Sequence, residues 1–419
     1  MNRKRGLIYR ENAAGELCRD MVALGKWLFI GVLIGLILGC AGSAFAHTLS
    51  RAAGLRHSHP WTMYTLPVGG LLIVLLYRVC RNTSDKGTNT VVMSIQESTD
   101  IPLRMAPLIF ISTTITQLCG GSAGREGAAL QLGGSIGKKL GRILRLGEDS
   151  QKILVMCGMS AGFSALFGTP MAAAVFSLEM VTVGVMRYGA LVPCVTASLT
   201  AWLTARFFQV PPEVFPVAAV PDVGAISLLK VVLLAAAAGA VSIGFCLLLH
   251  EAEHLYEKYI RNQYLRIALA GVLLIALTHI LGTHDYLGSG MGLIEHIFHG
   301  EGAAWYAFAL KMLFTAVTLG AGFKGGEIVP SFAIGATLGF ALSAVLGLPG
   351  DLAAACGMLG LFCGVTNSPI TSLLIGFELF GFAGMPYYLV TVAVSYLLSG
   401  YESLYRKQKI LMPKTRSEQ

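Results

Sequence analysis

The stretch FKGGEIVPSFAIGATLG (323–339) decides the architecture of this chain, because the first half contains a counterpart to it. That counterpart, GSAGREGAALQLGGSIG (121–137), also sets one glutamate among glycines and apolar residues. The two glutamates, Glu126 and Glu327, are 201 residues apart. A carboxylate at membrane depth is costly and usually functional, so both are candidates for an ion or proton pathway.

A second pair of segments repeats at nearly the same offset. FGTPMAAAVFSLEM (167–180) resembles TNSPITSLLIGFELF (366–380), and in each a proline precedes a glutamate by nine residues. A duplicated membrane domain is the simplest account, and many transporters are built from inverted repeats whose half-helices meet at an ion site. We predict repeat halves at about 22–207 and 227–405, joined by a proline-rich connector at 210–225.

Composition places the chain in a membrane. Of its 419 residues, 54% are hydrophobic and only 13% are charged, and the mean hydropathy is +0.67. Soluble domains carry about 25% charged residues, whereas the apolar runs at 27–46 and 231–249 are long enough to cross a bilayer. We predict one transport domain over 22–408, with a cytoplasmic segment at 1–21 and a short cytoplasmic tail at 409–419.

Glycine and proline interrupt the apolar segments. The chain has 50 glycines and 15 prolines, and several fall within 162–170 and 320–335. Interrupted helices are tolerated in membranes only where the backbone is buried or lines a cavity. The expected fold is therefore an all-α polytopic membrane protein with discontinuous helices.

The net charge of +8 does not indicate a nucleic-acid partner, because the basic residues form short clusters between apolar runs. Such clusters, at 2–5, 78–86 and 138–145, are typical of cytoplasmic loops, and we expect both termini in the cytoplasm.

The histidine-containing stretch 47–59 is interpreted as an exposed loop. The nine cysteines are scattered, so neither a disulfide framework nor a metal site is predicted, and no cofactor is expected.

The four repeated glutamates have alternative interpretations. Glu126 follows glycines at a predicted helix start, where free N–H groups attract an anion; its carboxylate would compete with a free anion until protonated, or would pair with Arg125 or cap the helix. Glu327 would belong to the same pathway, or lie in a solvated loop or pair with Lys324. Glu179 and its counterpart in the second half are interpreted as structural, through helix-end packing or hydrogen bonds to backbone.

Four segments together resemble a known family. GREGA (124–128), GFSALFGTPMAAAVFSLE (162–179), GGEIVP (325–330) and SLYRKQ (403–408) resemble, in order and spacing, the signature segments of the CLC family of anion channels and anion/proton exchangers. The resemblance covers about residues 22–408. It implies an inverted repeat of tilted and broken helices, and a homodimer in the lipid bilayer with an anion pathway in each subunit.

The resemblance also assigns candidate residues. It makes Glu126 the gating glutamate and Tyr405 the pore tyrosine, and it places the first anion-coordinating loop at DKGTNTVV (85–92), which departs from the family's usual Gly-Ser-Gly-Ile-Pro. The implied anion pathway comprises Gly87, Thr88, Asn89, Gly124, Arg125, Gly127, Gly325, Gly326, Ile328, Val329 and Tyr405, with Glu126 and Glu327 as gating and proton-coupling residues.

Two departures indicate a particular branch. Chloride/proton exchangers carry a second proton glutamate where this chain has Met180, and chloride-type members have an apolar residue followed by Phe where it has Glu327 and Ile328. The combination resembles the fluoride/proton antiporter branch, although that branch has a hydroxyl residue where Val329 stands. The resemblance implies export of fluoride driven by inward protons in a bacterial inner membrane.

Two other hypotheses stay open at this point. The first is a chloride channel or chloride/proton exchanger on the same scaffold. The second is a membrane-embedded enzyme that uses Glu126 and Glu327 as an acid/base pair. Paired carboxylates serve hydrolases beside sugar-sized clefts with aromatic platforms, and neither motif contains Trp or Tyr; we therefore expect a transporter rather than an enzyme.

Overall fold

The computed structural model describes residues 2–82 and 86–414, with side chains from residue 15 onward. Its first half contains α1 (Asn2–Ser58), the 3-10 turn η1 (Pro60–Thr65), α2 (Leu66–Val79), α3 (Thr88–Glu97), α4 (Met105–Leu118), α5 (Glu126–Ile143), α6 (Glu148–Phe167), α7 (Pro170–Glu179), β1 (Thr182–Val183), η2 (Tyr188–Ala190) and α8 (Leu191–Phe207). Its second half contains α9 (Ala225–Tyr259), α10 (Gln263–Leu281), α11 (Met291–Phe298), α12 (Ala307–Gly320), α13 (Ile328–Leu346), α14 (Gly350–Thr366), α15 (Pro369–Phe380), α16 (Met385–Leu398) and β2 (Lys409–Ile410).

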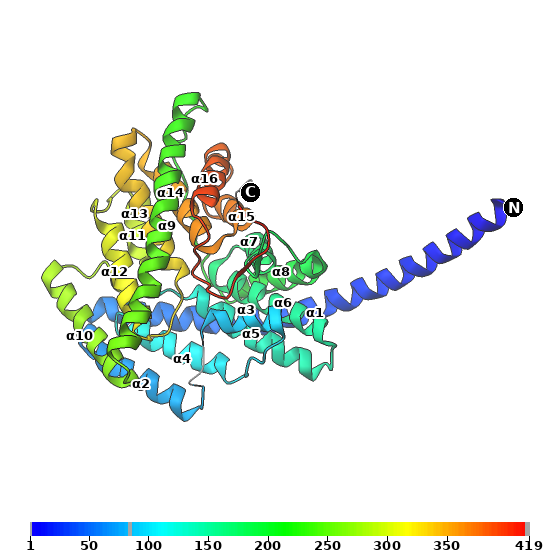
Figure 1. Cartoon of the computed structure of the whole chain (residues 1–419), viewed down its shortest axis with the longest axis horizontal. Coiled ribbons are helices and arrows are strands. Elements are labelled where there is room, and N and C mark those ends of the chain that lie inside the picture. Colours follow the sequence, from blue (N-terminus) through cyan, green and yellow to red (C-terminus); the bar gives the residue numbers. More distant parts are fainter. Residues whose placement is uncertain (1, 83–85, 415–419) are drawn as a thin grey trace.

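The two halves have the same internal packing. In the first half α1 packs against α6 and α8, and α5 against α6; in the second half α9 packs against α14 and α16, and α13 against α14. The halves meet where α2 contacts α10 and α7 contacts α15. The duplication predicted from the sequence is thus an inverted repeat of helices, arranged in one bundle (Figure 1). The division into domain, flanking segment and tail remains a prediction.

Close backbone contact in the core depends on glycine. A Cβ atom added to Gly158 in α6 would lie 2.1 Å from the carbonyl oxygen of Gly133 in α5, and one added to Gly357 in α14 would lie 2.1 Å from that of Gly335 in α13. Most of the surrounding side chains are buried. These two helix pairs therefore form equivalent, tightly packed centres of the two halves.

The predicted helix interruptions are confirmed. In the first half α6 ends at Phe167, Gly168 adopts a φ of +77°, and Pro170 starts α7. In the second half α12 ends at Gly320 and α13 begins at Ile328, within the predicted segment 320–335. A further break, not predicted, separates the end of α14 at Thr366 from the start of α15 at Pro369. A 10-residue helix such as α7 is about 15 Å long and cannot cross a hydrocarbon core of about 30 Å. Such half-helices place backbone termini inside the bundle.

Six helical segments among the described residues are long and apolar enough to cross a membrane: Gly15–Ser58, Pro60–Val79, Tyr188–Phe207, Ala225–Tyr259, Gln263–Leu281 and Ile328–Leu346. Shorter apolar helices fill the space between them. This arrangement is expected of a multi-pass membrane protein in which several elements do not span individually.

One sequence expectation is wrong. The stretch 47–59 is not a loop: α1 continues through it to Ser58. Leu49 and Ala52 are buried against the bundle, whereas Arg51, Leu55 and His57 are exposed, so the stretch is a largely exposed helix rather than an exposed loop. The N-terminal part of α1 projects away from the bundle (Figure 1), and the boundary expected between residues 21 and 22 falls inside this continuous helix.

Candidate anion-pathway site

The two glycine-flanked motifs meet at the centre of the molecule. Gly124 and Gly326 form an antiparallel bridge in which each amide donates to the other's carbonyl, at 2.6 and 2.8 Å. A Cβ on Gly326 would lie 2.6 Å from the amide nitrogen of Gly127, so only glycine fits there. The bridge brings together the N-termini of α5 and α13, which offer free N–H groups and positive potential to an anion.

Glu126 begins α5 and is fully buried. Its carboxylate accepts hydrogen bonds from the backbone amide of Arg125 at 3.1 Å and from Arg125 Nε at 3.2 Å. The ion pair considered as an alternative to a gating role is therefore present. The two roles are compatible, because a carboxylate held by a guanidinium at a helix N-terminus occupies the position that a free anion would take.

Glu327 lies at the N-terminus of α13, on the other side of the same junction. A Cβ added to Gly127 would lie 3.1 Å from Glu327 Oε2 and 3.4 Å from Thr88 Oγ1. On the other strand of the bridge, a Cβ added to Gly124 would lie 3.2 Å from Glu126 Oε2, so both carboxyl groups lie at this junction. The Lys324 ammonium lies over the ring of Tyr77, and within the described residues Glu327 forms no ion pair. The site thus holds two neighbouring carboxyl groups.

The segment predicted to coordinate the anion leads into the start of helix α3. Gly87 precedes it with a φ of +62°, and Thr88 starts it with a buried side chain. Asn89 accepts a hydrogen bond from the amide of Lys407 at 3.1 Å, which ties this loop to the C-terminal segment. Asp85, in the predicted loop 85–92, lies outside the described residues. Thr88, Gly127 and Glu327 are therefore brought together, whereas Asn89 faces the C-terminal segment.

The C-terminal segment carries Tyr405 into the site. The amide of Leu404 donates to the carbonyl of Val365 at 2.9 Å, and Gln408 Nε2 donates to the carbonyls of Met180 and Thr366. These contacts bury Tyr405, whose hydroxyl has no hydrogen-bond partner among the described residues. Glu327 acts electrostatically on this phenol. An orphaned buried hydroxyl beside a carboxyl group is suited to donating to a small anion.

The remaining predicted residues surround this junction. Ile328 and Val329 form the fully buried first turn of α13. A Cβ on Gly325 would lie 2.5 Å from the Cβ of Ala123. The predicted residues thus lie around one junction, although their individual roles remain predictions. No group of three or more His, Cys, Asp or Glu residues that could hold a metal ion is found in the described part of the chain.

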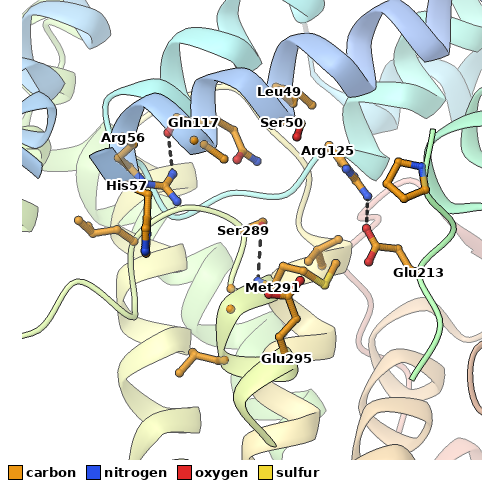
Figure 2. Close-up of a pocket in the computed structure, with 18 of the residues that line it drawn as sticks. Leu49, Ser50, Arg56, His57, Gln117, Arg125, Glu213, Ser289, Met291 and Glu295 are labelled. Carbon is orange, nitrogen blue, oxygen red and sulfur yellow. Dashed lines mark hydrogen bonds and ion pairs between the residues drawn. The ribbon is translucent and has the colours of Figure 1, made fainter. Parts of the chain in front are cut away.

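A cavity of about 1010 Å³ leads to Arg125. It is lined by the end of α1, the connector around Glu213, the loop at 284–290 and α11 (Figure 2). Arg125 Nη2 forms an ion pair with Glu213, and the two side chains point toward each other in the wall of the cavity (Figure 2). Sequence reasoning missed Glu213, although an acid between prolines in the connector VPPEVFP was a signal.

Lys311 was also missed. It is fully buried in α12, and its ammonium donates to Ser122 Oγ at 2.9 Å and to the carbonyls of Gly288 and Tyr286 at 2.8 and 3.1 Å. These contacts fasten the loop before Glu126 to the cavity wall. A lone lysine in an apolar helix is the same signal that singled out Glu327.

The other repeated glutamates bond to backbone, as their structural interpretation predicts. Glu179 accepts from the amides of Ile370 and Thr371 at 3.0 and 2.8 Å and from the Thr371 hydroxyl at 2.6 Å. In the second half, Glu378 accepts from amides in the first turn of α7, both at 2.9 Å. Each glutamate therefore caps the short helix of the opposite half.

Known proteins resemble this chain in sequence and in fold. Residues 69–400 match the sequence model of the voltage gated chloride channel family. A chloride/fluoride channel protein from Pseudomonas syringae pv. tomato is 36% identical over 395 residues, which cover 92% of this chain and 87% of that protein. The crystal structure of a CLC-type fluoride/proton antiporter has a TM-score of 0.89 and 34% identity, with 93% of this chain and 98% of that chain covered.

A more distant relative is the H⁺/Cl⁻ exchange transporter ClcA from Yersinia pestis bv. Antiqua, which is 24% identical over 402 residues, or 88% of this chain and 84% of that protein. The chain belongs to the voltage-gated chloride channel (CLC) family. It is a membrane transport protein, and the hypothesis of a paired-glutamate enzyme is therefore abandoned.

Proposed function

We propose that this protein exchanges fluoride for protons, and that it exports fluoride as protons flow inward. The observation that carries the proposal is the placement of the Glu327 carboxyl beside Gly127, where the half-helices α5 and α13 meet. Similarity to a CLC-type fluoride/proton antiporter supports the same substrate pair. A second carboxyl, that of Glu126, lies at the same junction.

The chemistry of the anion supports this assignment. Fluoride is a small, strong hydrogen-bond acceptor, and a protonated carboxyl group can donate a short hydrogen bond to it. Neutralising Glu126 removes the competing negative charge from the N-terminus of α5, and the freed N–H groups can then hold an anion. Because ionised Glu126 and fluoride compete for the same N–H groups, the protonation of Glu126 and the occupancy of the site by fluoride are linked, which couples the two movements.

Roles for the surrounding residues follow from the same geometry. Glu126 would act as the gate and Glu327 as a second protonatable station, with Thr88 and Tyr405 as hydroxyl donors and Gly127 as the point of closest backbone approach. Arg125 would stabilise the ionised gate. Similarity to H⁺/Cl⁻ exchangers and to a chloride/fluoride channel protein makes chloride the competing substrate.

We also propose that the protein acts as a homodimer in a bacterial inner membrane, with both termini in the cytoplasm. The basic clusters between apolar runs support this orientation, and the family resemblance supports the dimer. Single-molecule subunit counting in liposomes tests the dimer. Protease access to tags at each terminus in sealed vesicles tests the orientation.

Anion efflux from liposomes tests the substrate. Vesicles loaded with fluoride or chloride are assayed with ion-selective electrodes for the wild type and Glu327→Gln. We expect fluoride efflux to be much faster than chloride efflux. Glu327→Gln should slow fluoride at least about tenfold, because the amide still donates a hydrogen bond but can neither take up nor release a proton. Equal chloride and fluoride efflux would assign the protein to the chloride alternative.

A further inference from the structure

The guanidinium of Arg125 holds two carboxylates. Its Nε lies 3.2 Å from Glu126 Oε1, and its Nη2 contacts Glu213 Oε1. Glu126 is fully buried, whereas the side chains of Arg125 and Glu213 are each 18% exposed. Arg125 therefore connects the buried gate to an acid in the wall of the cavity (Figure 2).

The position of Glu213 is fixed from both sides by the connector between the repeat halves. On one side Pro212 packs against the end of α6, where a Cβ added to Gly168 would lie 3.1 Å from it. On the other side the amide of Phe215 donates to the carbonyl of Leu379 in α15 at 2.8 Å, and the Phe215 ring packs against Phe298. The acid is thus delivered to Arg125 by anchors in both halves.

We infer that Glu213 is a positioning residue of the exchange cycle, which shares Arg125 with Glu126 and so sets the pH at which Glu126 takes up its proton. The inference rests on the proposed function, in which Glu126 is the proton-coupled gate. When Glu126 is ionised, one cation faces two anions. When Glu126 is protonated, Arg125 stays paired with Glu213, and no charge is left without a partner.

Removing Glu213 changes this balance. Protonation of Glu126 would then leave the largely buried Arg125 without a counter-ion, which is costly. With Arg125 bound to Glu126 alone, the ionised gate is favoured, because a nearby opposite charge stabilises the ionised carboxyl. Proton uptake by Glu126 then requires a lower pH, and the anion site opens less often at neutral pH.

Other charged groups face this cluster from the surrounding elements. They are His47, Arg56 and His57 on α1, His284 and Asp285 in the adjoining loop, Glu295, His296 and His299 on α11, and Glu327 at the start of α13. Among the described residues, none of these forms an ion pair with Arg125. Asp285 is an exposed acid that lines the same cavity, and it is therefore the matched control for the general negative charge of the cavity.

The test is the pH dependence of fluoride-driven proton uptake by liposomes that contain the full-length protein. Glu213→Gln is expected to shift the profile to lower pH by about one unit, as pairing with a single opposite charge lowers carboxyl proton affinity by one unit or more. Glu213→Asp, which keeps the charge but draws it back, shifts the profile less. Asp285→Asn stays close to the wild type. Superimposable profiles for all four proteins overturn the inference.

A double variant tests whether Glu213 acts on the pH profile through Glu126. In the Glu126→Gln background, adding Glu213→Gln should leave the pH dependence of fluoride flux unchanged, because the partner through which Glu213 acts is absent. A shift that persists in that background overturns the inference while the proposed function stands. Absence of proton coupling in the wild type itself defeats the proposed function, and the inference with it. If Glu213→Gln does not fold, Glu213→Asp carries the same test, and an unshifted profile overturns it.

Discussion

Glu179 and Glu378 cap each other's halves of the protein. Glu179 bonds to the first turn of α15, and Glu378 bonds to the first turn of α7, in both cases through two backbone amides. Both helices begin with proline after an interruption. The exchanged caps therefore join the two repeat halves, because the first amides of each helix have no acceptor within the helix and are satisfied by a glutamate of the opposite half.

Removing one of these caps should lower stability. Glu378→Ala leaves two amides of α7 without their acceptor, and we expect the free energy of unfolding to fall by about 1–2 kcal/mol. The melting temperature in detergent measures the effect. Glu251→Ala, at an exposed position on α9, is the control. Equal melting temperatures for the two variants would contradict the capping role.

A methyl group at Gly127 should obstruct the site without unfolding the protein. The added carbon would lie 3.0 Å from Gly326 Cα and 3.1 Å from Glu327 Oε2. We expect Gly127→Ala to reduce fluoride turnover at least about tenfold, which corresponds to about 1.4 kcal/mol in the barrier. Gly292→Ala in α11, where the added carbon meets nothing within 4 Å, should keep its turnover. Equal turnover in both variants would remove Gly127 from the pathway.

The contact between α5 and α6 should tolerate no side chain. Gly158→Ala would place a carbon 2.1 Å from the Gly133 carbonyl oxygen, so the helices must separate. We expect a loss of about 3 kcal/mol or more, seen as little monodisperse protein and a lower melting temperature. By contrast, Gly25→Ala lies in open space on α1 and should be neutral or stabilising. Normal stability of Gly158→Ala would show that the core is less tightly packed.

Lys414 should make the free energy of unfolding depend on pH in the alkaline range. Its ammonium donates to Ser399 Oγ at 2.8 Å and lies over the ring of Tyr396, and burial lowers the pKa of Lys414 to about 8. Between about pH 8 and 10.5 the unfolded chain binds this proton more readily than the folded chain, so stability rises with pH. Thermal unfolding of the wild type and Lys414→Met checks this. The rise should be smaller in the variant, and identical slopes would contradict it.

The sequence was sufficient to predict the helix breaks and the meeting of the two motifs, because a local rule and a long-range pattern agreed there. Pro170 starts a short helix after a predicted break, and the motifs around Glu126 and Glu327 meet because the duplication relates them by an inverted repeat. It was insufficient where tertiary contacts decide. The connector acid Glu213 acquires its position from anchors in both halves, which no local pattern encodes.

Two further features were not predicted from the sequence. The polar stretch 47–59 continues α1 as far as Ser58 and lines the cavity, and its alanine, leucine and arginine residues are compatible with helix. Lys311 is a single charge in an apolar helix, and only the fold shows that three neutral oxygens receive its hydrogen bonds. Periodicity predicts which segments form helices, but not which polar groups find partners.

Proton movement driven by fluoride alone tests the central claim most directly. Liposomes with an outward fluoride gradient and no initial pH difference are monitored with a pH probe and a fluoride electrode. We expect fluoride efflux through the wild type to drive proton uptake against a developing proton gradient, and Glu126→Gln to abolish this uptake. Fluoride efflux without proton uptake by the wild type would show a passive channel and would refute proton-coupled exchange.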